Sequence, residues 1–237
     1  MPWTKRICAV LALALCGCAT PGGNPVDPLE PFNRAMFSFN DTVDGAVLKP
    51  VAQGYRSVVP GVVRTGVSNF FSNLEDAWTC VNNLFQGKFE DGAEDLGRFI
   101  FNSTFGLAGI FDFATGAGFQ KHNEDFGQTL GKWGVGSGPY LVLPLLGPST
   151  ARDGLALLVD TQADLAFRID GVPTHNVLYG TRAISNRTNL LDASSVLEAA
   201  ALDKYSFVRD AWMQRRRNLV YDGNPPRQKE DDDEDSR

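Results

Sequence analysis

The region that begins at Asp27 has the pattern of an amphipathic helix. Asp27, Pro28 and Glu30 are residue types favoured at the N-cap and in the first turn of a helix, and Pro50 favours a helix end just before it. Between these positions apolar residues recur at intervals of three and four, namely Leu29, Phe32, Met36, Phe39, Val43 and Val47. That spacing places them on one face, so the sequence predicts a single helix over this region.

The same periodicity continues in the next part of the chain. Apolar residues at helical spacing predict a helix over 62–86 and another over 89–101. Gln86 and Gly87 are typical of a helix C-terminus between them. The apolar residues 104–114 follow, with Gly106 and Gly109 allowing close backbone approach.

The C-terminal part also has helical spacing. Ser149 or Thr150 is expected to cap a helix, and a more polar helix is expected over 174–192. A last long helix is expected to start at Ser194 or Ser195 and to end near residue 223. Since no sustained alternation of period two is found, the expected fold class is all-α.

Residues 133–151 carry no charged side chain, yet their glycines and prolines prevent a continuous helix. The segment is therefore either a buried apolar loop or a re-entrant element that lines a cavity. We expect its central part to form a non-helical or broken-helix turn that borders a channel, with the Tyr140 hydroxyl facing a polar path. The residues concerned are Gly138, Pro139, Tyr140, Leu141, Val142, Leu143 and Pro144.

The N-terminus has the features of a lipoprotein signal peptide. Residues 1–17 combine a basic start with a short apolar stretch, and the sequence from Leu15 to Cys18 resembles a bacterial lipobox. Cleavage before Cys18 and lipidation of its thiol are expected to anchor the mature chain. Ala19 after the cysteine favours the outer membrane. Residues 18–26 are then a Pro/Gly-rich tether.

Composition limits the remaining possibilities. The chain has 237 residues, 43% of them apolar, and a formal net charge of −6. This suits one helical domain over 27–223 and argues against a nucleic-acid partner. Residues 224–237 end in an acidic run and are expected to be a disordered tail. Cys80 has no expected intrachain partner.

No catalytic, metal-binding or cofactor-binding pattern is found in the sequence. His122 to Asp125 is expected to be a polar loop, and Asp76, Asp112 and Asp125 are expected to have capping or surface roles. The arginine run 215–217 fits a helix C-terminus better than a lipid-phosphate site. The sequence therefore does not predict an enzyme.

Six segments in order resemble the MlaA (VacJ) family of outer-membrane lipoproteins. They are residues 27–34, 68–74, 83–87, 98–112, 125–131 and 134–140. The resemblance covers roughly residues 18–222 and leaves the acidic tail outside. It implies a single ring- or disc-like helical domain that carries a broken apolar hairpin. It also implies that the domain is embedded in the inner leaflet of the outer membrane.

The resemblance further implies transport of stray phospholipid from the outer leaflet through an amphipathic channel to a soluble periplasmic carrier (MlaC-like). It implies association with a trimeric porin and maintenance of outer-membrane lipid asymmetry. Phe32, Met36, Ser38 and Phe39 of the first helix are expected to belong to a gate. The alternatives are a structural, porin-associated lipoprotein that moves no lipid, and a membrane-surface hydrolase.

Overall fold

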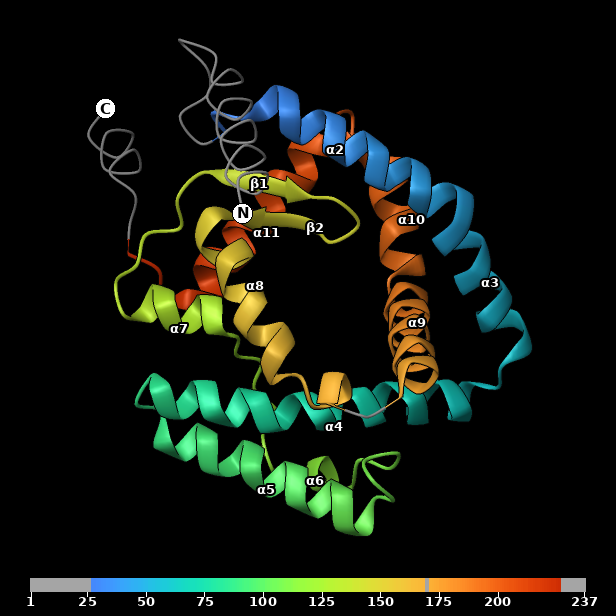
Figure 1. Ribbon diagram of the computed structural model, residues 1–237, viewed down its shortest axis with the longest axis vertical. Helices are drawn as coiled ribbons and strands as arrows, with labels where there is room; N and C mark the ends of the chain where they lie inside the picture. Colours follow the sequence, from blue (N-terminus) through green and yellow to red (C-terminus); the bar gives the residue numbers. More distant parts are fainter. Residues whose placement is uncertain (1–26, 169–170, 227–237) are drawn as a thin grey trace, which may run out of the picture.

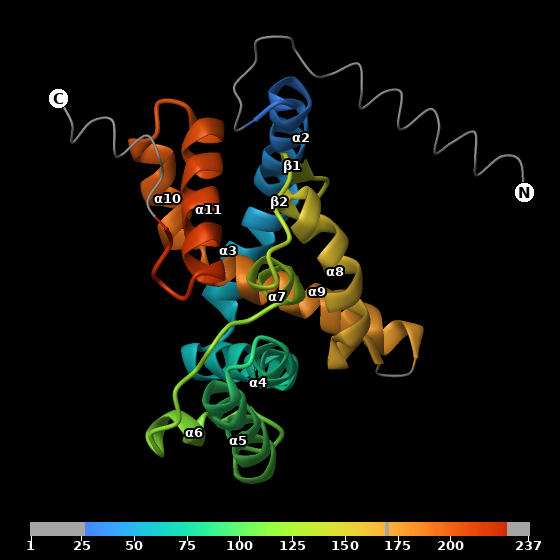
Figure 2. The same ribbon diagram turned by 90° about the vertical axis from the view of Figure 1, so that its left-hand side faces the viewer.

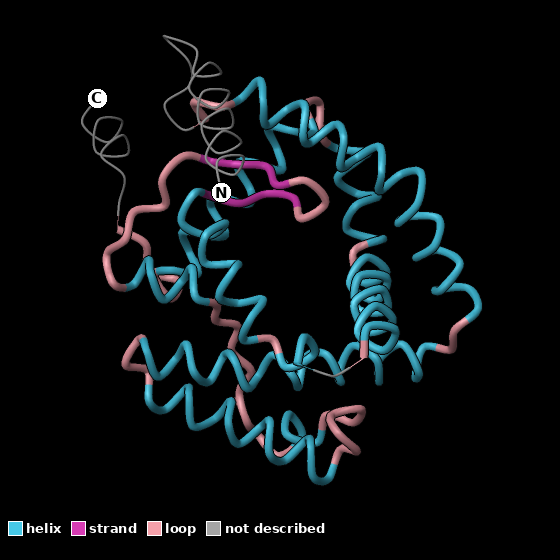
Figure 3. The backbone as a smooth tube through the Cα atoms, in the orientation of Figure 1, coloured by secondary structure: helices cyan, strands magenta, loops and turns pink. Residues whose placement is uncertain are grey.

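The computed structural model describes residues 27–168 and 171–226. The expected signal peptide, Cys18, the tether to residue 26 and residues 227–237 of the expected tail lie outside the described residues. Within the described part the chain is mostly helical, and one short hairpin supplies the only strands (Figure 3). The expected all-α class is confirmed, with this hairpin as a small addition.

The first half of the chain contains α2 (Glu30–Val43), a π-helical turn (Asp44–Leu48), α3 (Lys49–Val58), α4 (Gly61–Phe85), α5 (Phe89–Phe105), α6 (Phe113–Gly116) and α7 (Phe126–Lys132). The second half contains β1 (Tyr140–Leu143), β2 (Gly147–Thr150), α8 (Ala151–Ala163), a 3₁₀ turn (Leu165–Arg168), α9 (Val172–Asn189), α10 (Leu191–Ala200) and α11 (Lys204–Val220).

The elements follow a ring-like path (Figure 1). The hairpin, α8, α4 and the pair α9–α10 surround the centre of that view, and α2 and α3 run along the outside of α9 and α10. α5 and α6 lie on the outer side of α4. Figure 2 shows from the side that α4 and α5 form one end of the molecule.

The expected end of the first helix before Pro50 is wrong. Helical backbone continues from α2 through the π-helical turn into α3. In the π turn, the Lys49 N–H donates to the carbonyl of Asp44, five residues back, which inserts an extra residue into the helix. Pro50 then lies in the first turn of α3, where a proline is tolerated.

Two other helix ends also differ from expectation. Leu29, not Asp27, is the N-cap of α2, and no side chain caps that helix. The expected last long helix is two helices, because residues 201–203 interrupt it and Asp203 caps α11 by accepting hydrogen bonds from the N–H groups of Tyr205 and Ser206. Asp is a favoured N-cap residue, so Asp203 favours the start of a new helix at this point.

Several local predictions are confirmed. α4 and α5 lie where the periodicity predicted them, and Gly87 between them has a φ of +79°, which favours glycine. Thr150 caps α8 by accepting from the Asp153 N–H. A small apolar core of Tyr140, Val142 and Tyr205 joins β1 to α11, with Met36 and Phe37 of α2 packed against it.

Candidate functional site

Polar and apolar side chains are distributed unusually among the described residues. Nineteen polar or charged residues are buried, against eleven apolar ones, while thirty large apolar side chains are exposed. A domain surrounded by water normally buries large apolar residues and keeps charged ones outside. The polarity of this molecule is therefore largely inverted.

The inversion is clearest between α4 and α5, whose contact face is polar. The Asn83 amide donates to the Asp95 carboxylate over 2.8 Å, and Arg98 Nε lies 3.4 Å from Asp76 Oδ2. All four side chains are buried. Since buried polar groups stabilise a fold only when they are paired, these contacts fix how the two helices align.

The same polar network extends into the turn before α6. Arg98 Nη2 lies 3.1 Å from Asp112 Oδ2, and the Asn102 amide donates to Asp112 Oδ1 over 3.0 Å. Burial alone would raise the pKa of Asp112, but hydrogen bonds from Thr115 and Asn102 and the charge of Arg98 lower that pKa to about 2. Asp112 is therefore a structural residue that is charged at neutral pH and caps α6.

The outward face of α5 is apolar. Phe89, Leu96, Ile100 and Phe105 (the α5 face) are exposed, Phe89 by 71%. The turn that follows adds further exposed apolar side chains, namely Leu107, Ile110, Phe111 and Phe113. An apolar surface of this extent marks contact with an apolar partner or a membrane.

The hairpin is held by two asparagines of α2. The Asn33 amide donates to the Tyr140 carbonyl (3.0 Å) and its Oδ1 accepts from the Val142 N–H (2.8 Å). Asn40 does the same two helical turns later, donating to the Leu143 carbonyl (2.9 Å) and accepting from the Leu145 N–H (2.7 Å). The side chains of α2 thus pair with β1 as a neighbouring strand would.

The residues expected to border a channel occupy different environments in this hairpin. Tyr140 and Val142 are buried, and Leu141 and Leu143 are half-buried. Gly138, Pro139 and Pro144 are exposed. The segment is non-helical, as expected, with Tyr140 opposite Thr150 and Leu143 opposite Gly147. The turn between the strands carries the exposed apolar residues Leu145 and Leu146, and in Figure 1 this turn points toward α10.

The expected direction of the Tyr140 hydroxyl is wrong. The side chain is fully buried, and its oxygen is enclosed without a hydrogen-bond partner. Its ring packs edge-on against Tyr205 and Trp212. Burial and the nearby Asp27 carboxylate raise the pKa of Tyr140 to about 12. Packing against α11, rather than contact with a polar path, determines the orientation of this residue.

The four residues expected in a gate all lie on α2. Phe32 and Met36 are half-buried, and Met36 packs against the core. Ser38 and Phe39 are exposed. Asn33 is the buried residue of this helix, so α2 contacts the hairpin region through the polar Asn33 and the apolar Met36, while Phe39 is exposed.

Asp27 has a structural role that its sequence position did not reveal. Its buried carboxylate accepts hydrogen bonds from the Asn33 amide (2.8 Å) and the Tyr205 hydroxyl, and Arg209 Nη1 lies 3.5 Å away. Burial and the bond to Asp27 raise the pKa of Tyr205. The residue joins the start of α2 to α11.

Five ion pairs connect the first long helix to the C-terminal helices, and we call them the ionic seam. They are Arg34–Asp203 (2.8 Å), Asp41–Lys204, Asp44–Arg187 (2.6 Å), Lys49–Glu198 (2.9 Å) and Arg56–Asp192 (2.6 Å). Asp44, at the start of the π turn, receives two hydrogen bonds from the Arg187 guanidinium. Ion pairs therefore lie along this whole side of the ring.

Arg216 has a different role from the expected interaction with the helix dipole. Its guanidinium pairs with Asp125 (2.5 Å) and with Asp153 (2.9 Å). Burial alone would raise the pKa of Asp153, but hydrogen bonds from Arg216 and Arg152 lower it. Asp125 also caps α7, so Arg216 fastens α11 to the starts of α7 and α8.

No group of three or more side chains that could bind a metal ion is found among the described residues. No described helix is long and apolar enough to cross a membrane. Cys80 is a buried free thiol.

The polar contact face of α5 could have been recognised in the sequence. Asp95, Arg98 and Asn102 of α5 stand three and four positions apart, which is the spacing of one helix face. The apolar residues that predicted this helix lie on its opposite face, which points outward.

Fold and surface together define an all-helical protein with a polar interior and apolar outer faces. The family model described as MlaA lipoprotein matches residues 25–219. A relative from Haemophilus influenzae, named intermembrane phospholipid transport system lipoprotein MlaA, is 34% identical, covering 96% of this chain and 95% of its own. The relative of that name from Escherichia coli K12 is 36% identical, covering 85% of this chain and 82% of its own.

A solved structure from work on the maintenance of bacterial outer membrane lipid asymmetry has the same fold. Its TM-score is 0.72 at 36% identity, and the match covers 82% of this chain and 98% of that one. The chain belongs to the MlaA lipoprotein family. The relatives are named for a transport system, which agrees with the prediction that this protein is not an enzyme.

Proposed function

We propose that this protein is a lipoprotein of the outer membrane that removes mislocalised phospholipid from the outer leaflet and passes it to a soluble periplasmic carrier. The main observation in support of this proposal is the inverted polarity of α4 and α5. Polar groups within a membrane protein pair with one another and face inward, while apolar side chains meet the lipid. The contact face and the α5 face follow this rule.

In this proposal the protein lies in the inner leaflet of the outer membrane and is held there from the periplasmic side. The expected lipid on Cys18 supplies one anchor and the α5 face supplies a second. Two such signals give stable membrane attachment where one alone is weak. The family relationship supports an outer-membrane location.

The proposed lipid path passes the hairpin and α8. Leu145 and Leu146 at the tip and Leu155, Leu158 and Val159 on one face of α8 are exposed and apolar. Acyl chains would contact these side chains, while the headgroup follows polar residues, because moving a charged group through hydrocarbon is costly. Phe32, Met36, Ser38 and Phe39 of α2 would gate the path.

Two partners complete the proposal. A trimeric porin would hold the domain at its depth in the membrane, and an MlaC-like carrier would accept the lipid. No bond is broken in this transfer, so catalytic residues and cofactors are not required.

The test is transfer of fluorescent phosphatidylethanolamine by the purified full-length lipoprotein. The protein is placed in vesicles that contain the labelled lipid, and label in a soluble lipid-free acceptor is measured after the vesicles are removed. Transfer above that of protein-free vesicles is expected. Bound phospholipid should also be extractable from the purified protein.

Transfer equal to the protein-free background would overturn the proposal and favour a structural lipoprotein. The Leu145→Asp/Leu146→Asp double variant, whose changes lie at the exposed tip, should fold and insert but transfer poorly.

A further inference from the structure

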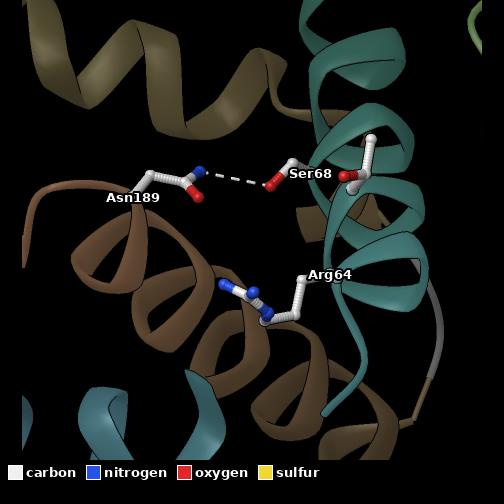
Figure 4. Close-up of a pocket in the computed structure, with 5 residues that line it drawn as sticks. Arg64, Ser68 and Asn189 are labelled. Atoms are coloured by element: carbon white, nitrogen blue, oxygen red, sulfur yellow. Dashed lines mark hydrogen bonds between the residues drawn. The ribbon is translucent and has the colours of Figure 1, made fainter. Parts of the chain in front are cut away.

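A pocket of about 310 Å³ lies between the start of α4 and the end of α9 (Figure 4). Its lining consists of Gly61, Arg64, Thr65, Ser68 and Asn189. The first four residues lie on one face of α4, since they are three or four positions apart. In Figure 4, Arg64 extends from α4 toward α9, and the Asn189 amide donates to Ser68 Oγ over 3.2 Å.

Arg64 is one of two half-buried arginines in the described part of the chain that have no carboxylate partner; the other is Arg217, which donates to the Pro226 carbonyl. Arg64 Nε donates to the Val59 carbonyl (3.2 Å), and in the described part of the chain no carboxylate pairs with its two terminal nitrogens. Other buried or half-buried arginines pair with carboxylates, namely Arg98, Arg152, Arg182, Arg187, Arg209 and Arg216. Arg64 thus presents two charged donors to the pocket.

A second positive group lies at the same place. Gly61 is the first residue of the 25-residue helix α4, and no side chain caps this end. A Cβ on Gly61 would lie 3.8 Å from Arg64 Nη2, so the guanidinium is close to the helix N-terminus. That terminus carries a partial positive charge, so a cation there is unfavourable without an anion between them.

We propose that this pocket binds the phosphate group of a phospholipid, and the inference rests on the transport function proposed above. Arg64 and the free N–H groups at the start of α4 hold the charge, and Thr65 and Asn189 donate further hydrogen bonds. Val58 and Val62, 81% and 80% exposed, flank the turn at this helix start. They provide apolar surface for the acyl chains of the same molecule.

The test measures binding of dihexanoylphosphatidylglycerol, below its micelle concentration, to the full-length protein in non-ionic detergent by calorimetry. Inorganic phosphate is the second probe. Arg64→Gln should weaken lipid binding at least tenfold, and Arg64→Lys should weaken it less. Arg215→Gln, which removes the same charge from an exposed position on α11, is the matched control and should change binding less than twofold. Inorganic phosphate should bind more weakly than the lipid and show the same dependence on Arg64.

Equal lipid binding by wild type and Arg64→Gln would overturn the proposal. Inorganic phosphate that binds as tightly as the lipid would overturn the assignment to phospholipid. Circular dichroism checks folding, and Thr65→Val, at an exposed position, replaces Arg64→Gln if that variant is unfolded. In the transfer assay, a wild-type rate in Arg64→Gln would reject the pocket and leave the proposed function standing. If the wild-type protein transfers no lipid, the proposed transport function is wrong. Lipid binding that depends on Arg64 would still support the proposed phosphate site in the pocket.

Discussion

At the residue scale, burial of a polar group has opposite consequences at two neighbouring tyrosines. The Tyr205 hydroxyl donates to Asp27, whereas the equally buried Tyr140 hydroxyl has no partner. A hydrogen bond to a charged acceptor stabilises a fold, and a buried hydroxyl without a partner destabilises it. The two residues therefore form a natural comparison within one core cluster.

Tyr205→Phe should lower the free energy of unfolding by about 2 kcal/mol, because the buried Asp27 carboxylate loses a donor. Tyr140→Phe removes a hydroxyl without a partner and should be neutral or slightly stabilising. Thermal unfolding in detergent, followed by circular dichroism, measures both. A Tyr140→Phe variant as unstable as Tyr205→Phe would show that the Tyr140 hydroxyl has a partner in solution.

Asp112 predicts a dependence of stability on pH. Its folded-state pKa of about 2 lies below the ordinary 3.8, so its stabilising effect is present above the ordinary value and is lost as pH falls toward 2. Asp112→Asn should be less stable than wild type by about 1 kcal/mol at pH 6, allowing for solvent screening. The difference should narrow at pH 2.5. A difference that is constant with pH would contradict this assignment.

At the element scale, α4 and α5 show what periodicity can and cannot predict. The spacing of Phe89, Leu96 and Ile100 correctly located α5, but a period identifies a face without showing whether that face meets protein, water or lipid. The polar contacts of Asp95 and Arg98 come from another helix and a distant turn. The local spacing of Asp95, Arg98 and Asn102 marks a polar face, but it does not show which residues that face contacts.

The same limit explains the hairpin. β1 is four residues long, and the groups that pair with one of its edges come from Asn33 and Asn40, about a hundred residues earlier. A strand this short gives almost no alternation signal. The continuation of the helix past Pro50 could not be predicted either, because the π turn before it leaves no mark in the pattern of apolar positions.

If the α5 face lies in lipid, a probe at Ile100 should sense hydrocarbon. Ile100→Cys carrying a nitroxide, in a Cys80→Ala background and in vesicles, should collide several-fold more often with dissolved oxygen than with a water-soluble nickel complex. Gln214→Cys on α11, also exposed, is the control and should favour the nickel complex. Electron paramagnetic resonance measures both. Similar nickel accessibility at the two positions would place the α5 face in water.

At the scale of the whole molecule, the ionic seam closes the ring by joining residues of the first long helix to α9, α10 and α11. Its pairs are mostly partly exposed, and such pairs weaken as salt shortens the screening length. The closure of the ring should therefore depend on ionic strength more than the polar contact face of α4 and α5 does.

Raising KCl from 50 mM to 1 M should lower the free energy of unfolding, because salt screens the five pairs of the ionic seam. Arg187→Gln, which removes the bidentate pair with Asp44, should lower stability at low salt and reduce the salt dependence. Thermal unfolding in detergent at both salt concentrations tests this. Unchanged stability in 1 M KCl would show that other contacts close the ring.

The two asparagines of α2 have a consequence for how copies of this chain behave toward one another. An unpaired strand edge is a template on which another chain can add a strand, and this leads to aggregation. Asn33 binds the Tyr140 carbonyl and the Val142 N–H of β1, and Asn40 binds the Leu143 carbonyl and the Leu145 N–H at the turn. Leucine at both positions would keep the size of the side chains but leave these backbone groups without their partners. The wild-type asparagines are therefore expected to protect the protein against self-association through this strand.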